Sequence, residues 1–384
     1  MSTNKGLEGV VVAETRLSMV DGQAGELIIG GFDVAELAMN ATFEETVWLL
    51  WHGEMAEDVT PFRESLAERR VLPSATVELL RSMVGSGRLV RSGRRADETS
   101  APLSVMDALR IAAGTISLIP GDEALNLVAT FPTIVATYWH LLHDREPIAP
   151  RADLSHAANY LYMLNGEVPD AERVRGMETY LNTVIDHGLS ASTFTARVIT
   201  STESDLVSAI VGALGAMKGP LHGGAPGPAL DMVFEIGDAS RAEEVLRRKI
   251  ASGEKLMGFG HRVYKVRDPR ADVLAAATER MFTRGGDMHL YELAKAVEAT
   301  AVRLLAEYKP GRNLQTNVEF YTALLLHGLG LEVPLFTPTF SISRVAGWIA
   351  HALEQRKDNR IIRPQSVYIG RRGERMSPPL SAHV

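Results

Sequence analysis

Apolar residues recur with a helical period along most of the chain after residue 40. Two stripes with spacings of three and four residues carry this pattern: Leu206, Ile210, Leu214 and Met217, then Leu290, Leu293, Val297, Ala301, Leu304 and Leu305. Such spacing places side chains on one face of an α-helix. The pattern predicts a mainly α fold.

Helix start and stop signals support this prediction. Thr42 with Glu45 forms a capping box, and Gly53 marks the end of that helix. A helix is predicted to begin at Asp170, after Pro169, and to run to about Asp186. Two starts are predicted from a residue followed by proline: Asp268 before Pro269 and Thr337 before Pro338. The other predicted starts are Glu203 and a second capping box of Ser240 with Glu243.

The first forty residues differ from the rest. Short β-branched runs, Val10 to Val12 and Leu27 to Ile29, are followed by Gly30 and Gly31, which predicts a small β portion. Strands and helices do not alternate along the chain, so no doubly wound sheet is expected.

Composition narrows the functional classes. A chain of 384 residues predicts two domains. The net charge of −7 without a dense basic tract argues against nucleic-acid binding, and the lack of cysteine excludes disulfides and thiolate chemistry. The N-terminus is polar and does not resemble a signal peptide. Pro132 and polar residues interrupt the most apolar stretch, residues 125–142, so it is not expected to span a membrane. Together these features indicate a cytoplasmic protein that does not bind a membrane.

Two glycine-flanked loops carry the candidate chemistry. His222 follows the predicted end of a helix at Gly219, where backbone amides can face a ligand. His261 follows a second glycine pair, and Arg270 lies in the first turn of the helix capped by Asp268, a good place to bind a carboxylate. A lone loop histidine is more often structural, and these residues alone do not name a reaction. No metal-ligand spacing such as H-E-x-x-H occurs, and no G-x-S-x-G elbow occurs.

An ordered set of motifs resembles the citrate synthase family over nearly the whole chain. The matching segments are GLEGVVVAETRLS (6–18), TFEE (42–45), LLWHG (49–53), DLSHAANYLYM (153–163), GPLHGG (219–224), GFGHRVYKVRDPR (258–270), FTP (336–338), SRVAGW (343–348) and NRIIRP (359–364). The resemblance implies a two-domain homodimer, with a large domain of residues 1–220 and 326–384. It also implies a small domain of residues 221–325 that closes over the substrates, and a helix of the dimer interface at residues 203–217.

The resemblance also implies roles for individual residues in condensing an acyl-CoA with a 2-oxo dicarboxylic acid. Glu319 would be the base, His222 would stabilise the enolate oxygen, and His261 would polarise the ketone of the oxo acid. The oxo acid would be bound by His187, Arg270, Arg344 and, from the partner subunit, Arg363. Coenzyme A, a co-substrate rather than a permanent cofactor, would contact Leu256, Gly258, Phe259, Gly260, Lys265 and Asn317. No metal is implied.

The chain departs from the family pattern at a few positions. Glu319 stands where aspartate is usual, Ser190 where asparagine is frequent, and Ala225-Pro226-Gly227 where Ala-Asn-Glu is commoner. Three functions stay open: a citrate synthase, a 2-methylcitrate synthase that uses propionyl-CoA, and a weakly active paralogue that senses CoA esters or oxo acids.

Overall fold

The computed structural model describes residues 5–7, 9–89, 102–223 and 226–373. Its strands are β1 (Ser18–Asp21), β2 (Glu26–Ile29) and β3 (Phe32–Asp33). Its α-helices are α1 (Val34–Asn40), α2 (Phe43–His52), α3 (Thr60–Ala67), α4 (Ser74–Leu89), α5 (Val105–Ala113), α6 (Glu123–Leu142), α7 (His156–Asn165), α8 (Ala171–Val184), α9 (Ala191–Thr200), α10 (Leu206–Met217), α11 (Pro226–Ile236), α12 (Ala242–Ala251), α13 (Pro269–Thr283), α14 (Met288–Tyr308), α15 (Val318–Gly328) and α16 (Phe336–Lys357). The predicted mainly α fold is confirmed.

The β portion is a small antiparallel sheet in the order β1-β2-β3. Ser18 pairs with Ile29 and Asp21 with Glu26, so the turn between β1 and β2 lies at residues 22–25. Leu27 and Ile29 point into the core, as alternation along a strand requires. The predicted strand at Val10 to Val12 is wrong: this segment forms no ladder, and its three side chains are exposed.

Two long helices form the centre of the molecule. Nearly every residue of α16 from Phe336 to Ala352 is buried, and α6 packs between α5, α7 and α16. The α6 helix is long and apolar enough to cross a membrane, but 89% of its apolar window is covered by the rest of the protein. It is a core helix, and its interior Pro132 is fully enclosed.

Local capping signals explain where most helices begin. The capping box of Thr42 and Glu45 and the left-handed Gly53 are present, and Asp170 and Asp268 each cap the helix predicted for them. Glu203 does not start a helix, because its φ is positive and Asp205 caps α10 instead.

The capping box predicted at Ser240 is also wrong. The side chain of Asp238 accepts hydrogen bonds from the backbone N–H and the hydroxyl of Ser240, which forms a 3₁₀ turn, and α12 begins only at Ala242.

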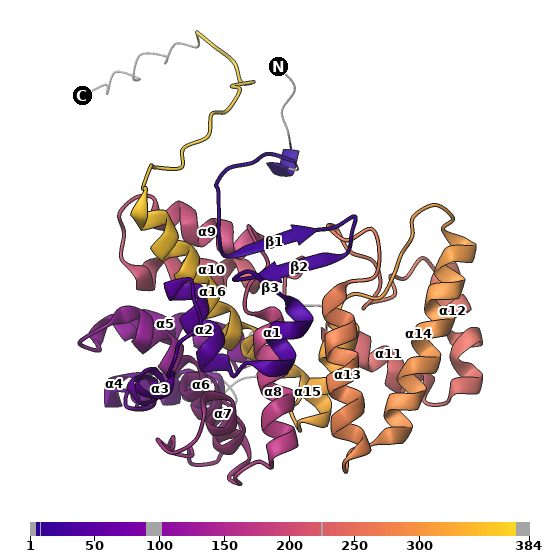
Figure 1. Ribbon diagram of the computed structural model, residues 1–384, viewed down its shortest axis with the longest axis horizontal. Coiled ribbons are helices and arrows are strands. Elements are labelled where there is room, and N and C mark those ends of the chain that lie inside the picture. Colours follow the sequence, from indigo (N-terminus) through magenta and orange to yellow (C-terminus); the bar gives the residue numbers. More distant parts are fainter. Residues whose placement is uncertain (1–4, 8, 90–101, 224–225, 374–384) are drawn as a thin grey trace, which may run out of the picture.

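Helices α11 to α14 gather on one side of the molecule, and α15 lies between them and the central helices (Figure 1). Helix α13 packs against both α8 and α15, which joins the two regions. The predicted domain boundary at 220/221 falls in the turn after α10, whereas the boundary at 325/326 falls inside α15. The division into domains stays a prediction.

Candidate active site

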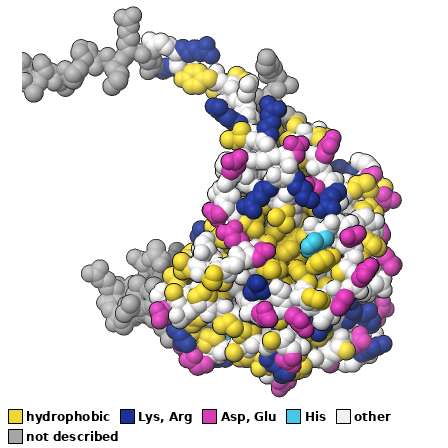
Figure 2. Space-filling model, turned by 60° about the vertical axis from the view of Figure 1, so that its left-hand side comes forward, with side chains coloured by type: hydrophobic (Ala, Val, Ile, Leu, Met, Phe, Trp, Pro, Cys, Tyr) yellow, Lys and Arg dark blue, Asp and Glu magenta, His cyan; other side chains and the backbone are white. Residues whose placement is uncertain are grey.

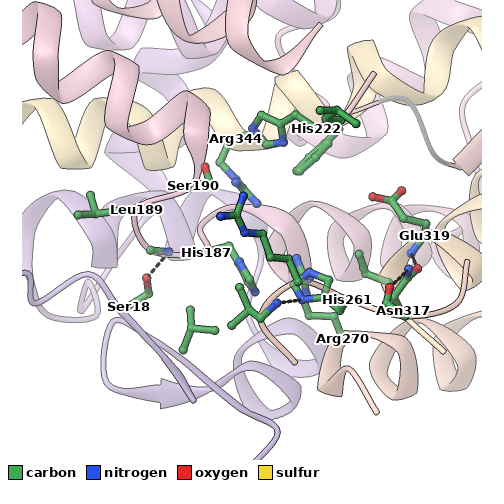
Figure 3. A pocket seen from close by; sticks show the side chains of 18 of the residues that line it. Ser18, His187, Leu189, Ser190, His222, His261, Arg270, Asn317, Glu319 and Arg344 are labelled. Carbon is green, nitrogen blue, oxygen red and sulfur yellow. Dashed lines mark hydrogen bonds between the residues drawn. The ribbon is translucent and has the colours of Figure 1, made fainter. Parts of the chain in front are cut away.

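Most of the residues predicted for the site surround one cavity of about 660 Å³. Its walls come from β1, the loop after α8, the turn after α10, the loop before α13 and the first turns of α13 and α15, with α16 behind. The predicted residues that line it are His187, His222, Gly260, His261, Arg270, Asn317, Glu319 and Arg344. Arg270 and Arg344 point into the same space, with His222 and Glu319 at its edge (Figure 3).

His222 is oriented by two residues of other helices. Its Nε2 lies 2.7 Å from the hydroxyl of Ser192, and the indole N–H of Trp348 donates to that same hydroxyl at 3.1 Å. With Trp348 donating to Ser192, the hydroxyl can donate its own hydrogen to His222 Nε2, and in that arrangement Nδ1 carries the imidazole hydrogen. Burial, and then the charge of Arg344, lower the pKa of His222 to about 4. This histidine is therefore a neutral hydrogen-bond donor at neutral pH.

His261 has the opposite tautomer. The backbone N–H groups of Val263 and Tyr264 both donate to its Nδ1 at 3.0 Å, so Nε2 carries the hydrogen. Burial, and then Arg270, lower the pKa of His261 to about 4. The turn of the β1–β2 hairpin supports this loop, because the backbone N–H of Lys265 donates to Gly22 O at 2.8 Å.

His187 completes a small aromatic cluster on the floor of the cavity. Its Nε2 lies 3.1 Å from the hydroxyl of Tyr264, and its ring meets the ring of His261 edge-on at 5.8 Å. Burial, followed by the charges of Arg270 and Arg344, holds the pKa of His187 well below 6.5. All three histidines of the cavity are uncharged at neutral pH.

The two buried arginines have different partners. Arg270 makes a bidentate pair with Asp268, at 3.0 and 2.8 Å; burial lowers the pKa of Arg270, but Asp268 outweighs burial and the net pKa is raised. Arg344 donates from Nε to Val184 O at 2.7 Å, and its Nη2 has no hydrogen-bond partner among the described residues. A buried guanidinium with a free nitrogen facing a cavity is suited to bind a carboxylate.

Glu319 lies in the first turn of α15, which Asn317 caps by accepting from the backbone N–H of Glu319. Burial raises the pKa of Glu319 to about 7, although Arg270 and Arg344 act in the opposite direction. A carboxylate whose pKa lies near the working pH is well matched to a general base.

Paired backbone segments hold the His261 loop against α15. Gly260 N donates to Gln315 O at 2.7 Å and Asn317 N donates to Gly258 O at 3.0 Å. Gly258 has a φ of +87°, and a Cβ there would lie 2.9 Å from Phe320, so both conformation and space require glycine. The glycines of this motif therefore serve close packing.

A second cavity of about 370 Å³ shares Gly260 and Asn317 with the first, and it also contains three further positions predicted to contact coenzyme A: Leu256, Gly258 and Phe259. Lys265 lies outside it and donates to Arg262 O at 2.9 Å. The cationic residues that line this cavity include Lys255, Lys309 and Arg312, which sequence reasoning missed. In the sequence, Lys309 stands in a Lys-Pro-Gly turn after the apolar stripe that ends at Leu305, and such a turn indicates a helix end and no ligand.

Within a single chain, Arg363 does not line the cavity that contains the other predicted site residues. It lines a separate cavity of about 1200 Å³ between the N-terminal segment and the segment after α16. Sequence reasoning also missed Ser192 and Trp348. Trp348 follows Arg344 by four residues and so shares its helical face, which was a usable signal, whereas Ser192 offered none.

The arrangement favours enolate chemistry on an anionic substrate: a base with a raised pKa, two neutral imidazole donors and two buried guanidinium groups around one space. Among the described residues, no group of three or more His, Asp or Glu side chains is placed to hold a metal ion. The mainly helical fold and this cavity define a class of helical enzymes with an anion site between arginines and histidines.

Comparisons with known proteins agree with that class. The sequence model described as "Citrate synthase, C-terminal domain" matches residues 6–365. The citrate synthase of Haloferax volcanii is 38% identical over 97% of each chain, and a 2-methylcitrate synthase of Mycobacterium tuberculosis is 38% identical over 95% of this chain and 90% of its own. The chain belongs to the citrate synthase family.

A solved structure extends the likeness to three dimensions. The citrate synthase of Thermoplasma acidophilum, solved as a ternary complex with carboxymethyl coenzyme A and oxaloacetate, superposes with a TM-score of 0.85 at 27% identity, covering 98% of this chain and 99% of the other.

Proposed function

We propose that this protein condenses acetyl-CoA with oxaloacetate to give citrate and free coenzyme A. The observation that carries the proposal is the convergence of Glu319, His222 and His261 on one cavity that also contains Arg270 and Arg344. Membership of the citrate synthase family supports it.

The first step is removal of a proton from the methyl carbon of the thioester by the Glu319 carboxylate. The negative charge moves to the thioester oxygen, where Nδ1–H of His222 donates a hydrogen bond. One such donor is worth roughly 3–4 kcal/mol to a transition state. The hydrogen bonds that Ser192 makes with His222 and Trp348 support the tautomer that this step requires.

The second step forms the carbon–carbon bond between the enolate carbon and the ketone carbon of oxaloacetate. Nε2–H of His261 polarises the ketone and passes its proton to the new alkoxide, and the proton that Glu319 took from the methyl carbon returns the imidazole to its neutral form. Water then cleaves the citryl thioester, which releases the coenzyme A thiol and leaves the third carboxylate of citrate.

The oxo acid would be held by Arg344 and Arg270 with His187 beside them. The free Nη2 of Arg344 supports a direct carboxylate contact. A third arginine, Arg363 of the partner subunit, would complete the set. Coenzyme A would occupy the second cavity, with Lys255, Lys309 and Arg312 near its phosphates, and the contact of Lys265 with a phosphate stays a prediction. In this proposal residues 221–325 form the small domain that closes over both substrates.

A homodimer is part of the proposal, because the two terminal segments project from the body (Figure 1) and carry exposed apolar side chains. Val11 is 87% exposed and Ile369 is 94% exposed. Figure 2 shows hydrophobic and basic side chains along the segment that projects from the body. Apolar side chains presented in this way are typical of an interface. We also propose a cytoplasmic location, as expected for an enzyme that consumes coenzyme A esters.

A hybrid-dimer experiment tests the role of Arg363. Glu319→Gln and Arg363→Ala should each be inactive alone. Co-expressed chains should recover roughly a quarter of the parent activity, because half of the dimers are mixed and each mixed dimer holds one complete site. Failure to recover activity would refute the contribution in trans.

The direct test of function is release of coenzyme A thiol when acetyl-CoA and oxaloacetate are mixed with the protein. No release with any acyl-CoA would refute the proposal. Binding of oxaloacetate by calorimetry without any release would instead favour a sensor.

A 2-methylcitrate synthase is the second candidate, favoured by the 38% identity to the M. tuberculosis protein of that name. One methylene is worth only about 1–3 kcal/mol of discrimination, so both thioesters can react at one site. The ratio of kcat/KM for propionyl-CoA and acetyl-CoA decides between them.

A further inference from the structure

One face of α16 contacts three consecutive residues of the segment that precedes His187. Arg344 donates from Nε to Val184 O at 2.7 Å, Gly347 packs against Ile185, and His351 Nε2 lies 3.2 Å from Oδ1 of Asp186. The three α16 residues are spaced by three and four positions, so they share one side of the helix. These three contacts fix the distance between α16 and the loop that carries His187.

The middle contact depends on the missing side chain of Gly347. A Cβ at this position would lie 2.2 Å from the carbonyl oxygen of Ile185 and 3.2 Å from Oδ1 of Asp186. Any larger residue would push the segment away from the helix. The close approach is what brings the Asp186 carboxylate within reach of His351.

Asp186 is fully buried and links α16 to β1 and to the loop after α8. Its Oδ2 accepts from the Ser18 hydroxyl at 2.5 Å, and the backbone N–H of Gly188 donates to that hydroxyl at 2.9 Å. Burial raises the pKa of Asp186, but His351, Arg344 and Ser18 outweigh burial and lower it to about 2. The residues on both sides of His187 are therefore anchored to one ionised carboxylate.

His351 is itself held in one tautomer. Nε of Arg197 donates to His351 Nδ1 at 3.0 Å, and a guanidinium has no lone pair with which to accept. Nδ1 is thus an acceptor, and Nε2 carries the hydrogen that points at Asp186. Arg197 is fixed in turn by Gln355 and Glu354.

We propose that His351 and Asp186 are positioning residues that hold His187 at the correct distance from Arg344 and so set the affinity for the oxo acid. The pair lies behind the cavity and outside the set of residues that line it. This inference rests on the proposed function, because it assigns the pair to the oxo-acid half of that site. Coenzyme A binds elsewhere in that scheme, so its binding should not depend on the pair.

The test compares steady-state constants for both substrates. His351→Phe should raise the KM for oxaloacetate about tenfold, equivalent to about 1.4 kcal/mol, and leave the KM for acetyl-CoA within about twofold. His351→Gln keeps an amide N–H near the Nε2 position and should restore most of the loss. Ser18→Ala, which reaches Asp186 from the opposite side, should give the same selective change. His140→Phe is the matched control, since His140 is a buried histidine whose Nε2 lies 2.8 Å from Met163 O and which does not line the cavity.

Equal rises in both KM values, an unchanged oxaloacetate KM in His351→Phe and Ser18→Ala, or the same effect in His140→Phe would each overturn the proposal. Calorimetric binding of oxaloacetate to parent and variants measures the same affinity without turnover. A parent that binds oxaloacetate but releases no coenzyme A would refute the proposed function and still leave the positioning role open to this measurement.

Discussion

Replacing Glu319 by glutamine should stabilise the protein while it abolishes turnover. The pKa of Glu319 is raised from 4.5 to about 7, chiefly by burial, so the folded protein resists ionising this group. At about 1.36 kcal/mol for each pH unit, ionised Glu319 costs the native state about 3 kcal/mol. Glutamine has a similar shape and carries no charge at any pH.

The sign of the pH dependence follows from the raised pKa. Protonated Glu319 favours the folded state fully below pH 4.5, and this contribution is lost as the pH rises through about 7. The advantage of Glu319→Gln over the parent in free energy of unfolding should therefore be under about 1 kcal/mol at pH 5 and about 3 kcal/mol at pH 8.

Urea unfolding of both proteins at pH 5 and pH 8, at one protein concentration, measures this difference. Glu57→Gln, at an exposed position in the loop after α2, is the control and should show no pH-dependent difference. An equal advantage at both pH values, or a parent that is the more stable protein at pH 8, would show that burial does not control the Glu319 carboxylate.

Three further changes test the site. Ser192→Ala removes the partner of His222 Nε2 and should lower kcat roughly 10- to 100-fold with an unchanged oxaloacetate KM. The reason is that His222, the donor to the enolate, loses a hydrogen bond worth about 1–3 kcal/mol. A change in KM alone would contradict this role. Arg344→Lys keeps the charge but removes the planar fork, and should raise the oxaloacetate KM at least tenfold, or about 1.4 kcal/mol, in initial-rate assays; wild-type KM would show that Arg344 does not bind the substrate. Glu319→Asp shortens the side chain by about 1.5 Å and should lower kcat on the order of 100-fold if the cleft is fitted to glutamate. Faster turnover would instead show that glutamate is the impaired residue.

Features controlled by neighbouring residues could be predicted from the sequence. The capping box at Thr42 and the starts at Asp170 and Asp268 depend only on side chains within a few positions of the helix end. The prediction at Ser240 was wrong for a local reason as well, since a nearby Asp238 competed for the same hydroxyl and backbone N–H. Val10 to Val12 has strand propensity but no strand beside it to pair with.

The candidate site could be predicted only as a set of residue types. The motifs named the side chains that line the cavity, but the contacts that orient them join distant positions: Ser192 with His222, and Trp348 with Ser192. Trp348 was missed, and its helical spacing from Arg344 was the one sequence feature that could have indicated it. The cations Lys309 and Arg312 of the second cavity were missed because their place beside Leu256 follows from how α14 and the 255–260 loop pack.

Protonation states decide what these side chains can do, and those states come from the assembled cleft. Each histidine is buried near Arg270 or Arg344, and both burial and those positive charges disfavour the imidazolium form. The same burial raises the pKa of Glu319 to about 7 in spite of the arginines. Of these groups only Glu319 changes its charge near neutrality, so the histidines must act as hydrogen-bond donors and the pH dependence of the reaction should follow this one carboxylate.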